Sequence, residues 1–352
     1  MNRLLSSRLE NLTPYVPGEQ PQDQQYLKLN TNESPFPPSA EALRWAQENV
    51  RPLNLYSEPV SRELRAAMAQ ALRVSPDQVM MTNGSDEALN LAMVALCDDA
   101  RPAAFPDITY GFYAVIARAN GVPYEEVPLK DDFTVDVSAL SAPGRTVFLA
   151  NPNAPTGIPL PLSEVRKLLN ADPDRAVVVD EAYVDFGGES AVSLLKEYDN
   201  LLVIGTFSKS RSLAGGRLGY AVGNPALIKA LDTLRDSTNP YNINSYTQAL
   251  GLAILKDEAR VRENCRRIVQ NREETAERLR ALGFAVLPSR TNFVFAAHPT
   301  IDGGELYRRL KARGVLVRHF DKERIARYNR ITIGTKEQMD RFFTILTELW
   351  EE

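Results

Sequence analysis

The stretch that decides the fold runs from Thr206 to Tyr220 and reads Thr-Phe-Ser-Lys-Ser-Arg-Ser-Leu-Ala-Gly-Gly-Arg-Leu-Gly-Tyr. It directly follows residues 201–205, a short apolar run that predicts a buried strand. A lysine just beyond a strand end, flanked by hydroxyls and followed by Gly-Gly-Arg, fits a site for a phosphorylated aldehyde. The amine of Lys209 can condense with the aldehyde, and Thr206, Ser208 and Arg217 can hold the phosphate. Taken alone, the run fits a surface lysine equally well.

A second strand end carries a carboxylate. The apolar residues 176–179 lead into Asp180, Glu181, Ala182 and Tyr183. A carboxylate at the end of a buried strand is unfavourable unless it is paired. The protonated ring nitrogen of pyridoxal 5′-phosphate (PLP) is a suitable partner, and this pair keeps the ring an electron sink. Tyr183 is then within reach of the ring hydroxyl, whereas a helix cap is the alternative role of Asp180.

A third strand end is followed by a rigid loop. Residues 151–157 read Asn-Pro-Asn-Ala-Pro-Thr-Gly and follow the apolar run 146–150. The two prolines and the glycine restrict the loop, so Asn153 can donate to the ring oxygen. Tyr110 is a candidate to stack on the ring. A plain turn for the loop and a place in the core for Tyr110 are the alternatives.

The fourth strand end opens a helix. Gly84, Ser85 and Asp86 follow the predicted strand 79–81, and free backbone N–H groups at a helix start bind anions. An ordinary N-cap explains the same residues. Ligands of open α/β sheets lie outside the carboxyl ends of the strands. Together the four strand ends therefore predict one PLP site anchored on Lys209.

The elements along the chain predict an α/β fold with a mostly parallel central sheet and a smaller α+β unit. The 352 residues suggest about two domains. We expect an N-terminal arm with part of the small domain at 1–45, a large PLP-binding domain at 46–240 and a small domain at 241–352. Helices are predicted at 61–72, 85–96, 244–255, 259–282, 304–313 and 337–350, and strands at 79–81, 146–150, 176–179, 201–205, 284–286, 292–295 and 330–333.

Composition excludes several classes of protein. The net charge of -4 gives no basic stripe for nucleic acid. No apolar run suits a signal peptide in residues 1–10 or a membrane span elsewhere, so a cytoplasmic protein that binds neither nucleic acid nor a membrane is expected. Cys97 and Cys265 are expected to be reduced and buried. No cysteine or second histidine stands at metal-ligand spacing from His298 or His319 in the sequence, so no metal site is predicted.

Over nearly its whole length the sequence resembles the aspartate-aminotransferase fold (PLP-dependent fold type I), and within it the histidinol-phosphate aminotransferases. The marks of this resemblance are the Asn-Pro-Asn loop, the Asp-Glu-Ala-Tyr strand end, the Ser-Lys run and the segments 14–18, 29–35, 56–59 and 330–335. Two departures, Ser34 where asparagine is commoner and Gly216 where leucine is usual, lie near the proposed chemistry but not in it.

The resemblance implies a role for each matching residue. Lys209 would form the Schiff base with PLP, Asp180 would pair with the ring nitrogen, and Asn153 and Tyr183 would bind the ring oxygen. Tyr110 would stack on the ring. The positions that match phosphate-binding residues are Gly84, Ser85, Asp86, Thr206, Ser208 and Arg217. The residues that match the substrate pocket are Tyr15, Asn32, Arg318 and Arg330.

The resemblance also implies a homodimer, because Tyr56 matches a tyrosine that reaches the cofactor phosphate of the partner subunit. The expected reaction transfers the amino group of histidinol phosphate to 2-oxoglutarate. An aromatic or broad-range aminotransferase and a PLP-dependent decarboxylase of a phosphorylated amino acid remain alternatives. A PLP-sensing regulator is disfavoured, since no basic helix-turn-helix segment precedes the arm.

Overall fold

The computed structural model describes residue 4 and residues 12–349. The expectation for residues 1–10 and the end of the last predicted helix at Trp350 lie outside the described residues. Within them, every helix and strand predicted above has a counterpart whose bounds differ by two residues at most.

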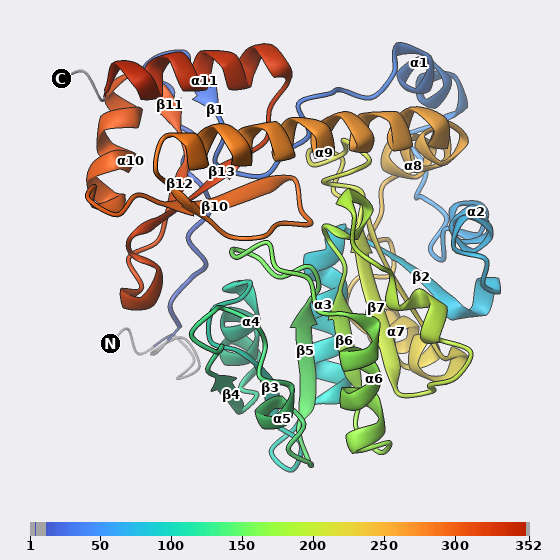
Figure 1. Ribbon diagram of the computed structural model, residues 1–352. Helices are drawn as coiled ribbons and strands as arrows, with labels where there is room; N and C mark the ends of the chain where they lie inside the picture. The colour runs from blue at the N-terminus through green and yellow to red at the C-terminus, as the bar shows by residue number, and fades with distance from the viewer. Residues whose placement is uncertain (1–3, 5–11, 350–352) are drawn as a thin grey trace.

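The large sheet carries the four strand ends singled out in the sequence (Figure 1). Its strands pair in parallel except β8, which runs antiparallel to both of its neighbours. The expected α/β class with a mostly parallel sheet is therefore confirmed. In spatial order the strands are β2 (Val79–Thr82), β8 (Gly219–Gly223), β7 (Leu201–Thr206), β6 (Val177–Asp180), β5 (Thr146–Ala150), β3 (Ala103–Pro106) and β4 (Tyr124–Val127).

Helices cover both faces of the large sheet, because alternate side chains of a buried strand point to opposite faces. Phe148 and Val178 pack with residues of α3 (Gly84–Leu96), α4 (Phe112–Asn120) and α7 (Pro225–Thr238). Their neighbours in sequence, Leu149 and Val179, belong to the cluster on the other face. That cluster includes residues of α6 (Leu162–Ala171), and the short helix α5 (Val137–Leu140) lies next to α6.

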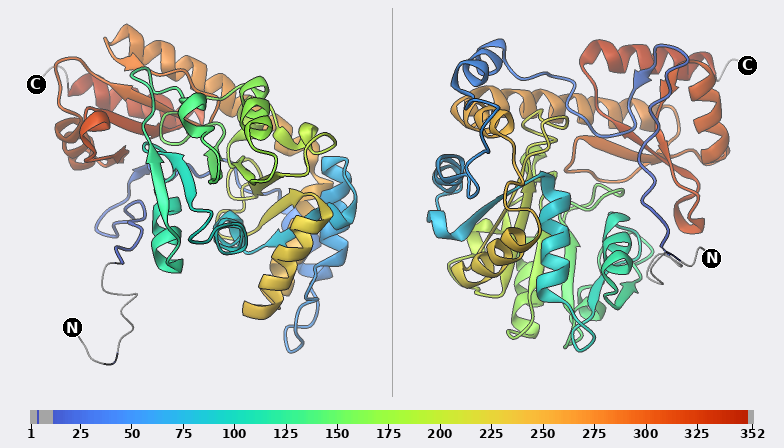
Figure 2. Two further views of the ribbon diagram at one scale, coloured as in Figure 1. Left: turned by 90° about the horizontal axis from the view of Figure 1, so that it is seen from below. Right: turned by 180° about the vertical axis from the view of Figure 1, so that it is seen from behind.

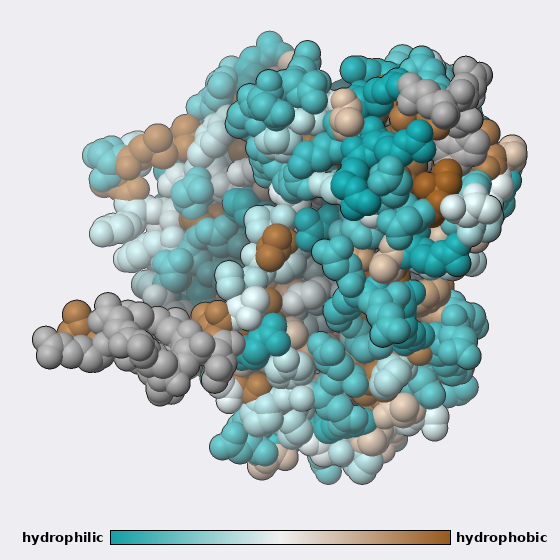
Figure 3. All heavy atoms as spheres, turned by 90° about the vertical axis from the view of Figure 1, so that its left-hand side faces the viewer, coloured by the Kyte–Doolittle hydropathy of each residue, from teal (hydrophilic) through white to brown (hydrophobic). Residues whose placement is uncertain are grey.

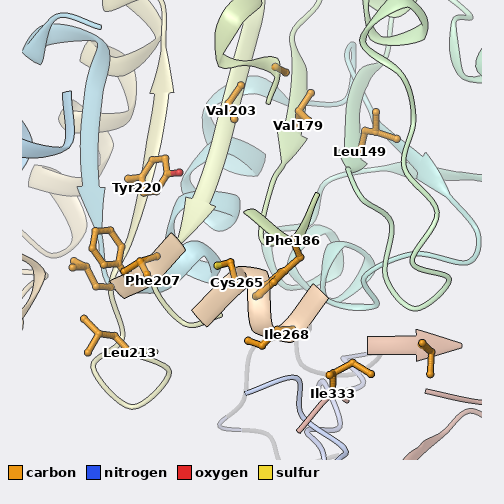
Figure 4. Close-up of a cluster of buried hydrophobic side chains, with 14 of the residues drawn as sticks. Leu149, Val179, Phe186, Val203, Phe207, Leu213, Tyr220, Cys265, Ile268 and Ile333 are labelled. Carbon is orange, nitrogen blue, oxygen red and sulfur yellow. The ribbon is translucent and has the colours of Figure 1, made fainter. Parts of the chain in front are cut away.

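The long helix α9 (Glu258–Ala281) joins the large sheet to a smaller one. Cys265 and Ile268 lie in the same apolar cluster as Val179 and Val203 (Figure 4). The same helix packs against the small antiparallel sheet. That sheet has the order β12 (Arg318–His319), β13 (Tyr328–Thr332), β10 (Phe293–Ala297) and β9 (Ala285–Val286). The helices α10 (Gly303–Ala312) and α11 (Lys336–Glu348) complete this α+β part.

The N-terminal segment lies along the C-terminal part of the chain (Figure 2). Its strand β1 (Leu27–Lys28) pairs in parallel with β11 (Val315–Leu316). Residues 12–39 contain no helix, as the prolines predict. The predicted boundary after residue 45 falls inside α1 (Ala40–Asn49), and the division into three parts stays a prediction.

The remaining elements connect these parts. They are α2 (Arg62–Leu72), α8 (Ser245–Lys256) and the short 3₁₀ helices η2 (Pro76–Gln78), η3 (Val184–Phe186), η4 (Ala191–Leu194) and η5 (Glu323–Ile325). None of the helices in the described part of the chain combines the length and the hydropathy that a membrane crossing requires. Cys97 and Cys265 are both free and buried, as predicted. The face turned to the viewer in Figure 3 is mostly hydrophilic, with scattered hydrophobic side chains.

Candidate active site

A cavity of about 500 Å³ opens beyond the carboxyl ends of β5, β6 and β7. Its walls come from the large sheet, the N-terminal segment and the small sheet, so it brings together residues that are far apart in sequence. The predicted site residues that line it are Tyr15, Asn32, Ser85, Asp86, Tyr110, Asp180, Tyr183, Thr206, Ser208, Lys209, Arg217, Arg318 and Arg330.

The amine of Lys209 lies at the centre of this arrangement. Its Nζ donates to the carbonyl oxygen of Thr31 at 3.2 Å and lies 5.8 Å from the ring centroid of Tyr183. Neither partner is a carboxylate, and no carboxylate in the described part of the chain forms an ion pair with this amine. Lys209 lies in the loop that follows β7, separated from the strand by Phe207 and Ser208, as the sequence predicted.

Asp180 is the buried carboxylate of the cavity, with only 5 % of its surface exposed. It accepts from the hydroxyl of Tyr113 at 2.9 Å and from the backbone N–H of Ala182 at 3.1 Å. Burial raises the pKa of Asp180 to about 6, and these two hydrogen bonds oppose that rise. A cationic partner in the cavity would favour the ionised form, as expected for a group that binds a protonated ring nitrogen.

The N-terminus of α3 supplies donors to the same cavity. Its N-cap residue, Asn83, makes no side-chain cap, and Ser85 faces the cavity. Gly84 has φ +75°, and a Cβ there would lie 2.7 Å from Nη2 of Arg217. A side chain at residue 84 would therefore displace the end of Arg217 and strain the backbone, so glycine suits this position. There Arg217 donates to Asp86 at 3.2 Å.

Two hydroxyls add to this end of the cavity. Thr206 Oγ1 and Ser208 Oγ lie 3.0 Å apart, and both residues are buried. The hydroxyl of Tyr110 donates to Asp86 at 3.0 Å, and burial together with the Asp86 charge raises the pKa of Tyr110. The backbone donors, hydroxyls and guanidinium provide the charge-assisted hydrogen bonds that a phosphate requires.

Two arginines form the opposite end of the cavity. Arg330 donates to the carbonyl oxygen of Asn30 at 3.0 Å, and its buried Nε has no hydrogen-bond partner among the residues that the structure describes. Its guanidinium lies over the rings of Phe293 and Phe320, and burial lowers its pKa. Arg318 donates to backbone carbonyls of the N-terminal segment. Because Arg330 has no acidic partner among the described residues, this end of the cavity suits an anionic group.

The phenol of Tyr15 lies between the two ends. Its ring makes an edge contact with Tyr110, with centroids 5.9 Å apart. Burial raises the pKa of Tyr15, and the charges of Arg330 and Arg318 oppose this rise. The N-terminal segment thus contributes a neutral hydroxyl to the same wall as the arginines.

These groups fit PLP. No cation in the described part of the chain forms an ion pair with the buried Asp180, and the helix start and hydroxyls can hold a phosphate. Lys209 lies between them, and its amine is held only by the carbonyl oxygen of Thr31. They also leave the arginine end for a second anion. The chemistry that the sequence predicted for separate strand ends is therefore found in one cavity.

Three predicted residues do not line this cavity. Gly84 acts through its backbone, as described above. Asn153 is buried, accepts from Thr109 and donates to the carbonyl oxygen of Ile108 and to the hydroxyl of Thr156. Tyr56 is 78 % exposed and stacks on Tyr241. Their predicted contacts with the cofactor stay predictions.

Sequence reasoning missed the groups that act on the predicted residues. Tyr113 binds Asp180 from α4, although it stands in the same aromatic run as Tyr110. The carbonyl oxygens of Thr31 and Asn30 bind Lys209 and Arg330. Backbone carbonyls carry no signal in the sequence, whereas the phenol of Tyr113 could have been found from the aromatic run.

Comparison with known proteins gives the family. The model of the aminotransferases of class I and II matches residues 24–346. The chain is 48 % identical to histidinol-phosphate aminotransferase 1 of Bradyrhizobium diazoefficiens over 99 % of this chain and 100 % of that protein. It is 47 % identical to histidinol-phosphate aminotransferase of a Marinomonas species, over 96 % of this chain and 97 % of that protein.

A solved structure agrees with the sequence relatives. Histidinol-phosphate aminotransferase from Sinorhizobium meliloti, crystallised in complex with PLP, superposes with a TM-score of 0.81 at 26 % identity. The match covers 89 % of this chain and 88 % of that one. The chain belongs to the class I and II aminotransferases and, within them, to the histidinol-phosphate aminotransferases.

Proposed function

We propose that this protein is a PLP-dependent aminotransferase that converts histidinol phosphate and 2-oxoglutarate to imidazole acetol phosphate and glutamate, a step of histidine biosynthesis. The observation that carries the proposal is one cavity that brings together the amine of Lys209, the buried carboxylate of Asp180 and Arg330, which has no acidic partner among the described residues. The nearly full-length similarity to histidinol-phosphate aminotransferases supports the choice of substrate.

Each residue of the cavity has a separate role in this reaction. Bound PLP supplies an electron sink for the bond that breaks at the substrate carbon. Asp180 would hold the ring nitrogen and Tyr183 the ring oxygen. Asn153 would bind the ring oxygen only by giving up its hydrogen bond to Ile108 or to Thr156. The amine of Lys209 moves the proton at the substrate carbon, and a positioned group of this kind contributes about 10²–10⁴-fold. The helix start of α3 and Arg217 hold the cofactor phosphate.

The arginine end would distinguish the substrates. Arg330 and Arg318 would bind the phosphate of the amino donor in one half-reaction and a carboxylate of the 2-oxo acid in the other. A guanidinium serves both, because its planar fork matches either anion. Tyr15 offers a neutral hydroxyl beside them.

A homodimer is part of the proposal. Tyr56 and Tyr241 stack with centroids 4.4 Å apart on the surface, and Leu53 and Leu55 are 76 % and 62 % exposed beside them. Exposed apolar groups next to one another favour an interface. Sedimentation of the holoenzyme should give twice the monomer mass, and a monomer at micromolar concentration would contradict the dimer.

A cytoplasmic location belongs to the same proposal. The two free cysteines support it, because cytoplasmic proteins rarely form disulfides.

A steady-state assay tests the substrate. Histidinol phosphate with 2-oxoglutarate should give glutamate with a kcat/KM well above that for phenylalanine as donor. A preference for phenylalanine would identify an aromatic aminotransferase. Release of CO2 without dependence on the keto acid would identify a decarboxylase.

A further inference from the structure

Asn32 makes four hydrogen bonds at the point where three parts of the chain meet. It is 1 % exposed. Its backbone N–H donates to Oγ1 of Thr332 at 3.0 Å, and its carbonyl oxygen accepts from Nδ2 of Asn292 at 2.9 Å. Its side-chain Nδ2 donates to the hydroxyl oxygen of Tyr183 at 2.9 Å.

The orientation of the Asn32 amide is set by Thr332. The backbone N–H of Asn32 can only donate, so it occupies a lone pair of Thr332 Oγ1. The hydroxyl hydrogen of Thr332 then goes to Oδ1 of Asn32, at 2.9 Å. With its oxygen held in this way, the amide presents its nitrogen, and not its oxygen, to Tyr183.

This orientation determines what Tyr183 can do. An amide nitrogen only donates, so the oxygen of Tyr183 must accept from Asn32. The hydrogen of the Tyr183 hydroxyl is then free to point elsewhere, and Tyr183 lines the cavity beside Lys209. Among the described residues the hydroxyl of Tyr183 makes no second hydrogen bond, so its hydrogen remains available to a ligand in the cavity.

The backbone of Asn32 supports a dedicated role. Its φ of +55° lies in the left-handed region, where asparagine, aspartate and glycine are tolerated better than other residues. The adjacent Thr31 carries the carbonyl oxygen that accepts from Lys209. The turn at Asn32 therefore presents one group to each of two residues proposed to act on the cofactor.

We propose that Asn32 is a positioning residue that makes the hydroxyl of Tyr183 a hydrogen-bond donor toward the ring oxygen of PLP. The inference rests on the proposed function only in that PLP binds the cavity. It differs from the role that the sequence suggested for Asn32, which was contact with the substrate.

The pH titration of the visible absorbance of the holoenzyme tests this inference. A donor to the ring oxygen stabilises the negative charge on that oxygen when the linkage to Lys209 loses its proton. Loss of the donor should therefore move the titration midpoint to higher pH, by about one unit for one hydrogen bond. The groups that act electrostatically on Tyr183 are Lys209, Arg330, Tyr15 and Tyr113, and the variants below leave all four in place.

Three variants test the role of Asn32. Two of them replace Asn32 by a residue that also tolerates the left-handed backbone, and the third leaves Asn32 in place. Asn32→Asp keeps the shape but offers an oxygen that accepts the hydrogen of Tyr183, so its midpoint should rise most. Asn32→Gly keeps the left-handed backbone and removes the side chain without adding charge. Thr332→Val leaves Asn32 in place but frees its amide to rotate. Both should give smaller rises, and they carry the test if Asn32→Asp does not retain the cofactor.

A double variant separates positioning from a merely structural role. In a Tyr183→Phe background, Asn32→Gly should shift the midpoint no further. The matched control is Asn329→Asp, because Asn329 is equally buried on β13 and its Nδ2 donates to Gly303, away from the cavity. This control should leave the midpoint unchanged.

Two outcomes would overturn the inference. One is a midpoint that stays at the wild-type value in Asn32→Asp and Asn32→Gly while KM for the amino donor rises, which would make Asn32 a substrate contact. The other is an equal shift with and without the Tyr183 hydroxyl. Neither measurement of the midpoint needs a substrate, so a wrong assignment of the amino donor would not affect the answer.

Discussion

The hydroxyl of Tyr113 donates to Oδ2 of Asp180 at 2.9 Å, from a helix on one face of the sheet to the end of its central strand. This hydrogen bond lowers the pKa of Asp180, which burial raises to about 6. It therefore helps to keep Asp180 ionised at neutral pH, as a partner of a protonated ring nitrogen must be.

Replacing Tyr113 by phenylalanine should shift the acidic limb of kcat/KM to higher pH. The ring keeps its edge contact with Phe105, but the hydrogen bond that favours the ionised carboxylate is lost. A neutral hydrogen bond contributes about 1 kcal/mol, so the shift should not exceed about one pH unit. An acidic limb identical to that of the wild type would show that Tyr113 does not act on Asp180.

Glu181 should make the holoenzyme less stable as pH rises. Burial raises its pKa from 4.5 to about 8, although Ser190 and Ala191 donate to it. The folded protein then holds this proton more tightly than the unfolded chain, so the free energy of unfolding falls between about pH 4.5 and 8. In Glu181→Gln the free energy of unfolding should fall less over this pH range, by an amount on the order of a few kcal/mol. Urea unfolding at pH 5 and pH 8 measures it, and equal slopes in both proteins would contradict the prediction.

Arg330 should determine the affinity for the phosphorylated donor. Arg330→Ala should lower kcat/KM for histidinol phosphate by about 10²-fold, since a charge-assisted hydrogen bond contributes about 1.5–3 kcal/mol. Arg330→Lys keeps the charge but loses the planar fork, so it should recover part of the loss. The control is Arg313→Lys. Arg313 forms an exposed ion pair with Glu348, so this variant should leave the kinetics unchanged. Wild-type kinetics in Arg330→Ala would place the substrate anion elsewhere.

A methyl group at Gly84 should weaken cofactor binding. Its Cβ would lie 2.7 Å from Arg217, and the backbone there has φ +75°. Gly84→Ala should therefore lower the affinity for PLP about tenfold, for a strain of about 1–2 kcal/mol. Titration of the apoenzyme with PLP measures this, and Gly144→Ala is a control, because it has the same φ with open space around it. Gly144→Ala should leave the affinity for PLP unchanged, and equal losses in both variants would assign the effect to a general loss of stability.

The strands that end at the cavity could be predicted because they are short apolar runs rich in β-branched residues. β8 was missed, since Gly219 and Gly223 at its ends do not favour a strand. The position of β8 depends on how closely it packs against β7, because a Cβ at Gly205 of β7 would lie 2.2 Å from the ring of Tyr220 on β8. Such a contact between neighbouring strands leaves no periodic pattern in the sequence.

The residues of the cavity that could be predicted are those whose own side chain suggests a chemical role. Lys209, Asp180 and Arg330 are charged groups next to strands or within one, and such positions are conspicuous. The partners of these residues were not predicted, because they lie far away in sequence. Tyr113 is 67 residues from Asp180, and Thr31 is 178 residues from Lys209. The orientation of Asn32 depends on Thr332, which only the folded chain brings near.

The central claim is that Lys209 holds PLP through its amine. Borohydride reduces the carbon–nitrogen double bond between a lysine and PLP to a stable single bond, so the modified residue can be found by mass spectrometry of a digest. The account predicts the pyridoxyl phosphate group on Lys209 and on no other lysine. Modification of a different lysine, or none in a holoenzyme that still transfers amino groups, would contradict it.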